Sequence, residues 1–318
     1  MTIPKGYVII SWKYHFERTK TFMIQDIYPH IYHNEYIQKK PSGDSFFLFY
    51  DQQAILTGSG SDKLRYFTMD EILKEFPHLK DDLTTHAIYL FAIDDRDFFL
   101  YFPKNAGEEV PSHSDVGEML GALGTFKPLS ILRSTEPAWL AFAGITGHQL
   151  YSWYLSRKFC GRCGHELVHA DRERMMHCPQ CNVMEYPVLS PAVIVGVTHN
   201  DRLLLTKYEG RSFKRYALIA GYAEIGETIE ETVHREVMEE VGLKVKNIRY
   251  YKSQPWSFSG TLLFGFFCDL DGNDEITLDT TELSTARWFK REDIPADGEN
   301  TSLTREMMLY FKSQGPAT

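Results

Sequence analysis

The chain has 318 residues, of which 43% are hydrophobic and 24% are charged. Both fractions are close to globular averages, which excludes a wholly disordered or collagen-like chain. The length predicts two large domains, or two with a small insert. Acidic residues outnumber lysine and arginine by 43 to 34, giving a formal net charge of −9. Nucleic acid or an anionic membrane would therefore need a local basic patch for binding.

Features that would direct the chain to a membrane or out of the cell are weak. No apolar run approaches the length of a membrane-spanning helix, and the apolar piece before Lys13 is too short for a secretory signal. The five cysteines do not resemble the disulfide framework of a secreted protein. We therefore expect a cytoplasmic protein with no membrane partner.

Residues 1–125 are predicted to form a β-rich N-terminal domain. Runs of β-branched and aromatic residues alternate with turn signals and predict strands at 8–12, 22–28, 45–50, 86–93 and 98–102. Asp94 to Asp97 predicts a hairpin turn, and 58–61 and 104–114 predict loops.

A helical pattern follows from 137 to 156, within a segment at 126–156 that is predicted to be a helical linker. The side chains available for its buried face are Leu140, Ala143, Leu150, Tyr151 and Tyr154.

Two pairs of cysteines lie in the middle of the chain. Cys160-Gly-Arg-Cys163 and Cys178-Pro-Gln-Cys181 are CxxC pairs separated by fourteen residues, a spacing typical of four thiolates around one zinc ion. Such a site has no open position for a substrate water, so we predict a structural zinc ribbon over residues 157–187. The weaker alternatives are four reduced core cysteines or a redox pair. The region holds five lysine and arginine residues against four acidic ones, which gives little support to nucleic-acid binding.

Residues 188–318 are predicted to form a second large domain that mixes strands and helices. Apolar runs predict strands at 192–197, 203–205, 262–267 and 286–289, with a turn at Asn200-Asp201 between the first two. Helices are predicted at 228–241 and 303–311.

The helix predicted at 228–241 carries a cluster of glutamates. Glu236 and Glu240 lie one turn apart on one helical edge, and Glu239 sits on the same side. Gly242 ends the helix. The neighbouring apolar stripe that docks the helix consists of Ile229, Val233, Val237 and Val241.

Like charges one turn apart repel, so this acidic edge needs a counter-charge. Carboxylate oxygens suit hard divalent cations such as Mg²⁺ or Mn²⁺, which in turn prefer phosphate oxygens as further ligands. The plain alternative is a solvated acidic face. Against it stand Gly221, Glu227, Arg235 and Gly242, each at a fixed spacing from the glutamates.

Residues 221–243 match the Nudix box, G-x5-E-x7-R-E-U-x-E-E-x-G-U with U an aliphatic residue, at every specified position. The chain is similar to the Nudix family in this segment. The resemblance implies an α+β chain whose last domain is an α/β/α sandwich, with the box holding catalytic metals. It also implies hydrolysis of a nucleoside diphosphate linked to another moiety.

The order of domains narrows the resemblance. A zinc ribbon directly before a Nudix domain, behind a β-rich domain, resembles the NADH pyrophosphatase family, which carries Ser-Gln-Pro-Trp-Pro-Phe-Pro after the box. Here the segment reads Ser253-Gln-Pro-Trp-Ser-Phe-Ser259, with serine at both later proline positions. The resemblance covers about residues 126–311 and implies a homodimer.

Site residues follow from this resemblance position by position. The implied ligands of Mg²⁺ or Mn²⁺ are Glu236, Glu240, Glu282 and the carbonyl of Ala220, with Glu239 as a further candidate. The implied zinc ligands are Cys160, Cys163, Cys178 and Cys181. The implied substrate-contacting positions are Arg133, Glu173, Tyr186, Tyr222, Gln254, Pro255, Trp256, Ser257, Phe258, Ser259, Gly260, Thr261 and Thr304.

The implied reaction cuts NAD(H) into nicotinamide mononucleotide and AMP, and the resemblance extends to removal of NAD caps from RNA. Bridging metals neutralise the phosphate oxygens and lower the pKa of water. Arg235 is expected to orient the glutamates through charge-assisted hydrogen bonds. The carboxylate that takes the proton of the water is left open among Glu240, Glu239, Glu227 and Glu282.

Two other functions remain open at this stage. One is a Nudix pyrophosphatase acting on ADP-ribose or dinucleoside polyphosphates. The other is a zinc-ribbon nucleic-acid-binding regulator that uses the Nudix fold as a ligand sensor.

Overall fold

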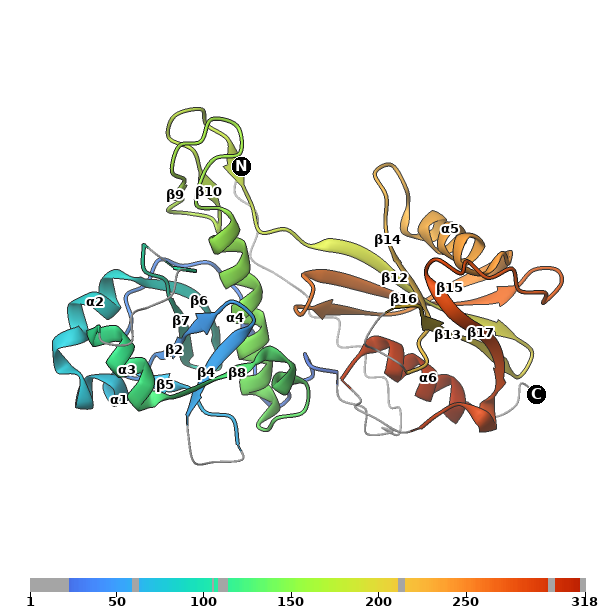
Figure 1. Cartoon of the computed structure of the whole chain (residues 1–318), viewed down its shortest axis with the longest axis horizontal. Coiled ribbons are helices and arrows are strands. Elements are labelled where there is room, and N and C mark those ends of the chain that lie inside the picture. Colours follow the sequence, from blue (N-terminus) through green and yellow to red (C-terminus); the bar gives the residue numbers. More distant parts are fainter. Residues whose placement is uncertain are drawn as a thin grey trace, which may run out of the picture.

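The computed structural model describes residues 23–58, 63–104, 106–107, 114–210, 215–296 and 301–314. It places two large parts side by side, and the segment with the cysteine pairs projects beyond the end of helix α4 (Figure 1). Within these ranges no helix is long and apolar enough to cross a membrane. The strand predicted at 8–12 and most of the loop predicted at 104–114 lie outside the described residues.

The first part is built on two small β-sheets, which confirms its predicted β-rich character. A five-stranded sheet has the order β1-β6-β7-β2-β5 and a three-stranded sheet has the order β3-β4-β8. Their strands are β1 (Tyr32–His33), β2 (Phe46–Leu48), β3 (Tyr50–Asp51), β4 (Ala54–Gly58), β5 (Phe67–Thr68), β6 (Ala87–Ile93), β7 (Arg96–Tyr101) and β8 (Gly124–Pro128).

Short helices that the sequence pattern did not predict pack against the sheets of this part. Thr68 and Glu71 form a capping box at the start of the first of them, which stabilises a helix of only two turns. Their bounds are α1 (Met69–Glu75), η1 (Pro77–Leu79), α2 (Lys80–Thr85), α3 (Asp115–Leu123) and η2 (Leu129–Arg133).

Two predictions in this part need correction. The described residues of the strand predicted at 22–28 form turns, because Asp26 bonds back to Met23 through both its amide and its carboxylate. The hairpin turn is shorter than predicted, since Ile93 already pairs with Arg96. Asp94 adopts a φ of 54°, as a two-residue hairpin requires.

Helix α4 (Ala138–Ser156) occupies the segment predicted as helical and is buried on more than one face. Tyr50, from the smaller sheet, donates to the carbonyl of Gly144 at 2.6 Å, and Tyr66 donates to that of Leu140 at 3.2 Å. The helix therefore packs into the main core of the first part. The domain boundaries predicted at 125, 156 and 187 stay predictions.

The cysteine-containing segment forms a small three-stranded sheet of order β11-β10-β9. Its strands are β9 (Val168–His169), β10 (Met176–His177) and β11 (Met184–Glu185). Tyr36 of the first part donates to the carbonyl of Ala170 at 3.1 Å, and Leu167 and Met176 pack into the core around α4. The segment is therefore fixed to the first part.

The second large part is a mixed sheet of order β15-β16-β12-β13-β17, with β14 paired to β12. The pairing of β12 with β16 is parallel and the others are antiparallel. The bounds are β12 (Ser190–His199), β13 (Arg202–Tyr208), β14 (Ile219–Tyr222), β15 (Val245–Trp256), β16 (Thr261–Leu270) and β17 (Leu283–Lys290). All four strands predicted here, and the turn at 200–201, are present.

Two helices cover opposite faces of this sheet (Figure 1), α5 (Ile229–Val241) and α6 (Leu303–Ser313), and the short η3 (Arg291–Asp293) follows β17. The alternation along β12 explains the layers, because Val193 and Val195 pack with α5 whereas Ile194 packs with α6. The α/β/α arrangement expected for residues 188–318 is present.

Helix α5 begins and ends as its sequence predicts. Thr228 caps it in a capping box with Glu231, and Gly242 ends it with a φ of 68°. The stripe residues Val233, Val237 and Val241 are completely buried. This docking fixes the neighbouring acidic edge of the helix in relation to the sheet.

Candidate active site

A pocket of about 910 Å³ lies at the acidic edge of α5. The sheet supplies its floor, and residues 301–308 at the start of α6 supply one side. Arg133, from the first part of the chain, also lines it. The volume is at the upper end of the range of small-molecule sites, so the pocket has room for a ligand of dinucleotide size.

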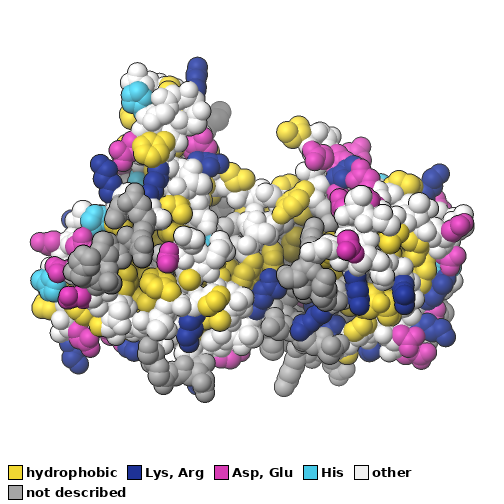
Figure 2. All heavy atoms as spheres, in the orientation of Figure 1, with side chains coloured by type: hydrophobic (Ala, Val, Ile, Leu, Met, Phe, Trp, Pro, Cys, Tyr) yellow, Lys and Arg dark blue, Asp and Glu magenta, His cyan; other side chains and the backbone are white. Residues whose placement is uncertain are grey.

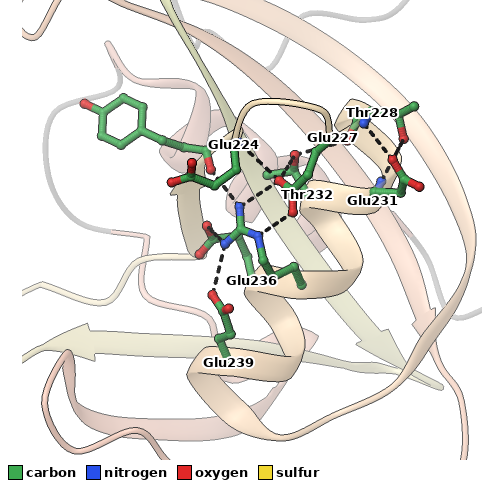
Figure 3. A network of polar contacts seen from close by, with 9 residues as sticks. Glu224, Glu227, Thr228, Glu231, Thr232, Glu236 and Glu239 are labelled. Atoms are coloured by element: carbon green, nitrogen blue, oxygen red, sulfur yellow. Dashed lines mark hydrogen bonds and ion pairs between the residues drawn. The ribbon is translucent and has the colours of Figure 1, made fainter.

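Arg235 is joined to three glutamates by a network of polar contacts in this pocket, and Figure 3 shows how Glu227, Glu236 and Glu239 lie in it. Its Nε and Nη2 donate to the two carboxylate oxygens of Glu227 at 2.6 and 2.9 Å. Nη1 donates to Glu236 at 2.7 Å and to Glu239 at 2.9 Å. Nη2 also donates to the carbonyl of Tyr222 at 2.8 Å. The expected contacts between Arg235 and the glutamates are therefore present.

Glu227 is held on one side of this network. Besides Arg235, it accepts from the amide of Glu224 at 3.1 Å and from the hydroxyl of Thr232 at 3.0 Å. The hydrogen bonds from Arg235 are the main cause that lowers the pKa of Glu227 to about 2. A carboxylate with so low a pKa is a weak proton acceptor, so Glu227 is suited to positioning Arg235.

Glu236 is buried against the backbone of β14. A Cβ atom on Gly221 would lie only 1.9 to 2.1 Å from the carboxyl group of Glu236. Glycine is therefore required at position 221 for Glu236 to keep this place. Burial raises the pKa of Glu236 above its ordinary value, and the nearby carboxylates of Glu239 and Glu282 raise it further against the opposing effect of Arg235.

The remaining carboxylates differ in exposure. Glu239 and Glu282 line the pocket, as does Ala220, whereas Glu240 is only 3% exposed beneath the acidic edge. Among the described residues, the glutamate oxygens do not form a group of three within 4.8 Å of one another. Of these three glutamates, Glu239 forms an ion pair with Arg235.

The segment after β15 joins the two parts of the chain. The rings of Trp256 and Phe258 lie 4.9 Å apart, and the guanidinium of Arg133 lies 5.0 and 4.7 Å from their centres. Both rings also pack against the core around α4. Trp256 lines the pocket together with Ser259, Thr261 and Thr304.

Two hydroxyl contacts lie beside Tyr222 at the pocket wall. Thr261 Oγ1 is 2.7 Å from the hydroxyl of Ser259 and 3.4 Å from that of Tyr222. Tyr222 is 53% exposed, so its side chain is accessible to a ligand in the pocket.

Several residues that were predicted to contact substrate do not line the pocket. Gln254 is completely buried, and its amide donates to Gln25 and to the carbonyl of Thr301 and accepts from the amide of Leu303. Glu173 and Tyr186 lie in the cysteine-containing segment, where the Tyr186 hydroxyl donates to Glu173 at 2.9 Å. Within the described chain, the pocket lining does not include these three, nor Pro255, Ser257, Phe258 and Gly260.

The four paired cysteines form a compact cluster. Sγ of Cys160 lies 3.5 Å from that of Cys181, and Sγ of Cys163 lies 3.4 Å from that of Cys178. All four sulfurs lie within 4.8 Å of one another. Sulfurs about 2.3 Å from a central zinc in a tetrahedron would lie about 3.8 Å apart, so this thiolate set fits a zinc ion.

Comparison with family models assigns both regions. Residues 188–311 match the NUDIX domain, and residues 156–186 match the NADH pyrophosphatase zinc ribbon domain. Residues 188–311 therefore form a domain that is similar to the NUDIX domain.

Curated relatives match part of this chain. The NAD-capped RNA hydrolase NudC of Shigella flexneri is 42% identical over 149 residues, which cover 47% of this chain and 58% of the relative. The protein of the same name from Escherichia coli (strain K12 / DH10B) matches to the same extent. The chain thus spans less than two thirds of the length of these relatives.

Solved structures also resemble the Nudix domain. A NUDIX hydrolase from Nitrosomonas europaea matches with a TM-score of 0.43 and 23% identity, over 49% of this chain and 92% of that chain. An ADP-ribose pyrophosphatase from Streptococcus suis matches with a TM-score of 0.33 and 19% identity, over 39% of this chain and 90% of that chain.

Several residues that line the Nudix pocket were not predicted from the sequence. Lys207, Arg215, Tyr216 and Glu224 all lie in its wall. None of them is at a fixed position of the Nudix box. The one signal in the sequence is the charged Lys207 directly after the apolar run of the strand. Only the pairing of β13 with the segment before β14 brings Lys207 and Tyr216 together.

Proposed function

We propose that this chain hydrolyses the diphosphate of NAD(H) to nicotinamide mononucleotide and AMP, and that it removes NAD caps from RNA. One observation carries the proposal: the complete Nudix box is folded so that Glu236, Glu239 and Glu282 line the same pocket as Trp256. The zinc ribbon of the NADH pyrophosphatase type supports the choice of substrate.

The acidic edge fits a catalytic divalent cation. Its donors are hard carboxylate and carbonyl oxygens, and burial with neighbouring negative charge raises the pKa of Glu236, which indicates a place where positive charge is favoured. We propose Mg²⁺ or Mn²⁺ there, with Glu236, Glu240, Glu282 and the carbonyl of Ala220 as ligands. Such an ion would neutralise phosphate oxygens and make water a better nucleophile.

The protein's own groups have separate tasks in this proposal. Glu227 positions Arg235, and Arg235 fixes the side chains of Glu236 and Glu239 at the pocket wall. This holds the acidic edge in one arrangement before the substrate arrives, so little reorganisation is needed during the reaction.

Glu239 and Glu282 are the best candidates for the group that takes the proton of the attacking water. Both line the pocket, whereas Glu240 is buried and Glu227 has a low pKa. Comparing the pH dependence of kcat for Glu239→Gln and Glu282→Gln tests this choice. Removal of the base should abolish the acidic limb of the profile, and removal of a group with another role should leave it in place.

Substrate contacts follow from the lining of the pocket. We propose that Tyr222 and Trp256 hold a base, with Arg133, Ser259, Thr261 and Thr304 around the substrate. Seven other predicted positions do not line the pocket and stay proposed contacts or supports of this region. They are Glu173, Tyr186, Gln254, Pro255, Ser257, Phe258 and Gly260.

The four cysteines are proposed to hold a structural Zn²⁺. Such a site stabilises the ribbon and its packing on the first part of the chain, and takes no part in the hydrolysis. We further propose that the protein acts in the cytoplasm as a homodimer.

Chromatographic product analysis tests the proposed reaction. NADH, NAD, ADP-ribose, a dinucleoside polyphosphate and NAD-capped RNA are each incubated with the protein and with Mg²⁺ or Mn²⁺. The proposal expects AMP and nicotinamide mononucleotide from NAD(H), and a decapped 5′-monophosphate RNA. Efficient cleavage of ADP-ribose or of the polyphosphate alone would place the chain among Nudix pyrophosphatases of other specificity. Binding of these compounds without any cleavage would favour the ligand-sensor alternative.

A further inference from the structure

Lys207 and Arg215 place two positive charges on one wall of the pocket. Lys207 is near the end of β13, and Arg215 lies just before β14. A bridge with two backbone hydrogen bonds of 2.9 Å joins Thr206 to Ala217, so the two segments run side by side in antiparallel fashion. This register sets Lys207 opposite Tyr216 and brings Arg215 to the same wall.

Tyr216 holds Lys207 in place. The ammonium nitrogen of Lys207 lies 4.3 Å from the centre of the Tyr216 ring, and this ring contacts Phe289 edge to face at 4.7 Å. Contact with the face of an aromatic ring orients an ammonium group without a carboxylate partner. Its N–H groups stay available for an anionic ligand.

The charge on this wall is not balanced as it is elsewhere in the pocket. Arg235 forms ion pairs with Glu227, Glu236 and Glu239. In the part of the chain that the structure describes, neither Lys207 nor Arg215 has an acidic group within ion-pair distance. Two cations that share a wall repel each other, and a bound anion would relieve this repulsion.

We propose that Lys207 and Arg215 form a second anion subsite, which binds a phosphate group on the adenosine ribose of the substrate. This inference rests on the proposed function, because it takes the diphosphate to lie at the acidic edge near Glu236. Lys207 and Arg215 are then left to bind a further phosphate group of the substrate, one that needs no metal ion. NAD(H) itself carries no such group.

Two kinds of substrate do carry one. In NAD-capped RNA, the 3′ oxygen of the adenosine is esterified by the next phosphate of the chain, and in NADP(H) the 2′ oxygen is phosphorylated. The chemistry that the subsite recognises is the same in both cases. Figure 2 shows that one face of the molecule carries acidic side chains over the region of α5, and lysine and arginine side chains lower down beside the groove between the two parts.

Binding of product analogues tests the subsite without any turnover. AMP, adenosine 2′,5′-bisphosphate and adenosine 3′,5′-bisphosphate are titrated into the full chain by calorimetry with no added divalent cation. We expect at least one bisphosphate to bind about ten-fold more tightly than AMP, a gain typical of a charge-assisted contact. The preferred isomer identifies the source, 2′ for NADP(H) and 3′ for capped RNA.

The variants Lys207→Met and Arg215→Gln should each remove this preference. Lys290→Met is the matched control, since Lys290 is an exposed lysine at the end of β17 that does not line the pocket, and it should keep the preference. Arg215 is exposed, so its variant is expected to fold even if Lys207→Met does not. Equal binding of AMP and both bisphosphates, or a preference that survives in Arg215→Gln, would overturn the proposal.

Kinetics separate failure of this inference from failure of the proposed function. The ratio of kcat/KM for NADPH or capped RNA to that for NADH should fall about ten-fold in the two variants and stay constant in Lys290→Met. If NADH is hydrolysed and the ratio is the same in all four proteins, the subsite is wrong and the function stands. If no NAD compound is hydrolysed but the bisphosphate preference is present, the function is wrong and the subsite stands.

Discussion

The cysteine cluster and the acidic edge of α5 are both proposed metal sites, and they are built differently. The four sulfurs already lie within 4.8 Å of one another, fixed to the first part of the chain. The glutamates instead surround the guanidinium of Arg235, and their oxygens are spread over a pocket wall and a buried position. One site is closed by its own ligands and the other opens into a cavity of about 910 Å³.

This difference predicts a structural role for the cysteine cluster and a catalytic role for the acidic edge of α5. A closed set of four thiolates leaves a metal no position for substrate, so its binding energy goes into folding. An open set of carboxylates held by an arginine can bind a divalent cation, and that cation can take phosphate oxygens as its other ligands. Loss of the first site should therefore affect the fold, and loss of the second should affect turnover.

The largest effect is expected from Cys163→Ser. Removal of one thiolate should reduce zinc from about one ion per chain to a small fraction and make the protein aggregate or melt at a much lower temperature, because structural zinc contributes folding energy directly. Metal analysis and thermal melting measure this. Cys268→Ala, at a buried cysteine outside the cluster, is the control for zinc content. A zinc-free sample that melts normally would contradict the structural assignment.

The second largest effect is expected from loss of a glutamate at the acidic edge, and it should change activity but not the fold. Glu236→Gln and Glu240→Gln should each lower kcat for NADH about 100-fold or more, since each removes an anionic group from the proposed metal site. The melting temperature should stay constant or rise slightly because the charge repulsion is reduced. Glu230→Gln, at an exposed position in the first turn of α5, is the matched control. Near-normal turnover in both variants would remove these residues from the mechanism.

Local and long-range features of these two regions differ in how far the sequence predicts them. Fixed spacings pointed to both proposed metal sites, because four cysteines or an acidic helix edge with Gly221 and Gly242 are local patterns. The capping box at Thr228 and the buried stripe are also local, so α5 was placed within one residue at its start.

Features that depend on contacts between distant segments could not be predicted. The contact of Gly221 with Glu236, the stacking of Arg133 on Trp256 and the placement of Lys207 opposite Tyr216 arise only when the sheet forms. In the first part, the turn at 23–26 was mistaken for a strand because Ile24 and Ile27 are buried apolar residues in an irregular segment.

The third prediction concerns the network in the open site. Arg235→Lys should keep a positive charge but lose the paired contacts to Glu227 and the simultaneous contacts to Glu236 and Glu239. We expect kcat to fall about ten-fold with little change in KM, because the substrate does not contact this group in the proposal. Steady-state kinetics with NADH measures the split. A rise in KM alone would show that Arg235 binds substrate instead.

The smallest effect is expected from Phe258→Ala. Phe258 contacts Trp256 and Arg133 at the junction of the two parts. If this cluster shapes the site for the second base, kcat/KM should fall a few-fold more for NADH than for ADP-ribose. Melting curves control for loss of packing. An unchanged ratio would limit Phe258 to joining the two parts.

The most direct test of the division between the two sites is one metal add-back measurement. The protein is freed of weakly held divalent ions, its zinc content is determined, and NADH cleavage is followed by chromatography before and after Mg²⁺ or Mn²⁺ is added. The account predicts about one retained zinc per chain, no cleavage before addition, and release of AMP after it. Cleavage that persists with zinc alone, or no cleavage with either added metal, would contradict it.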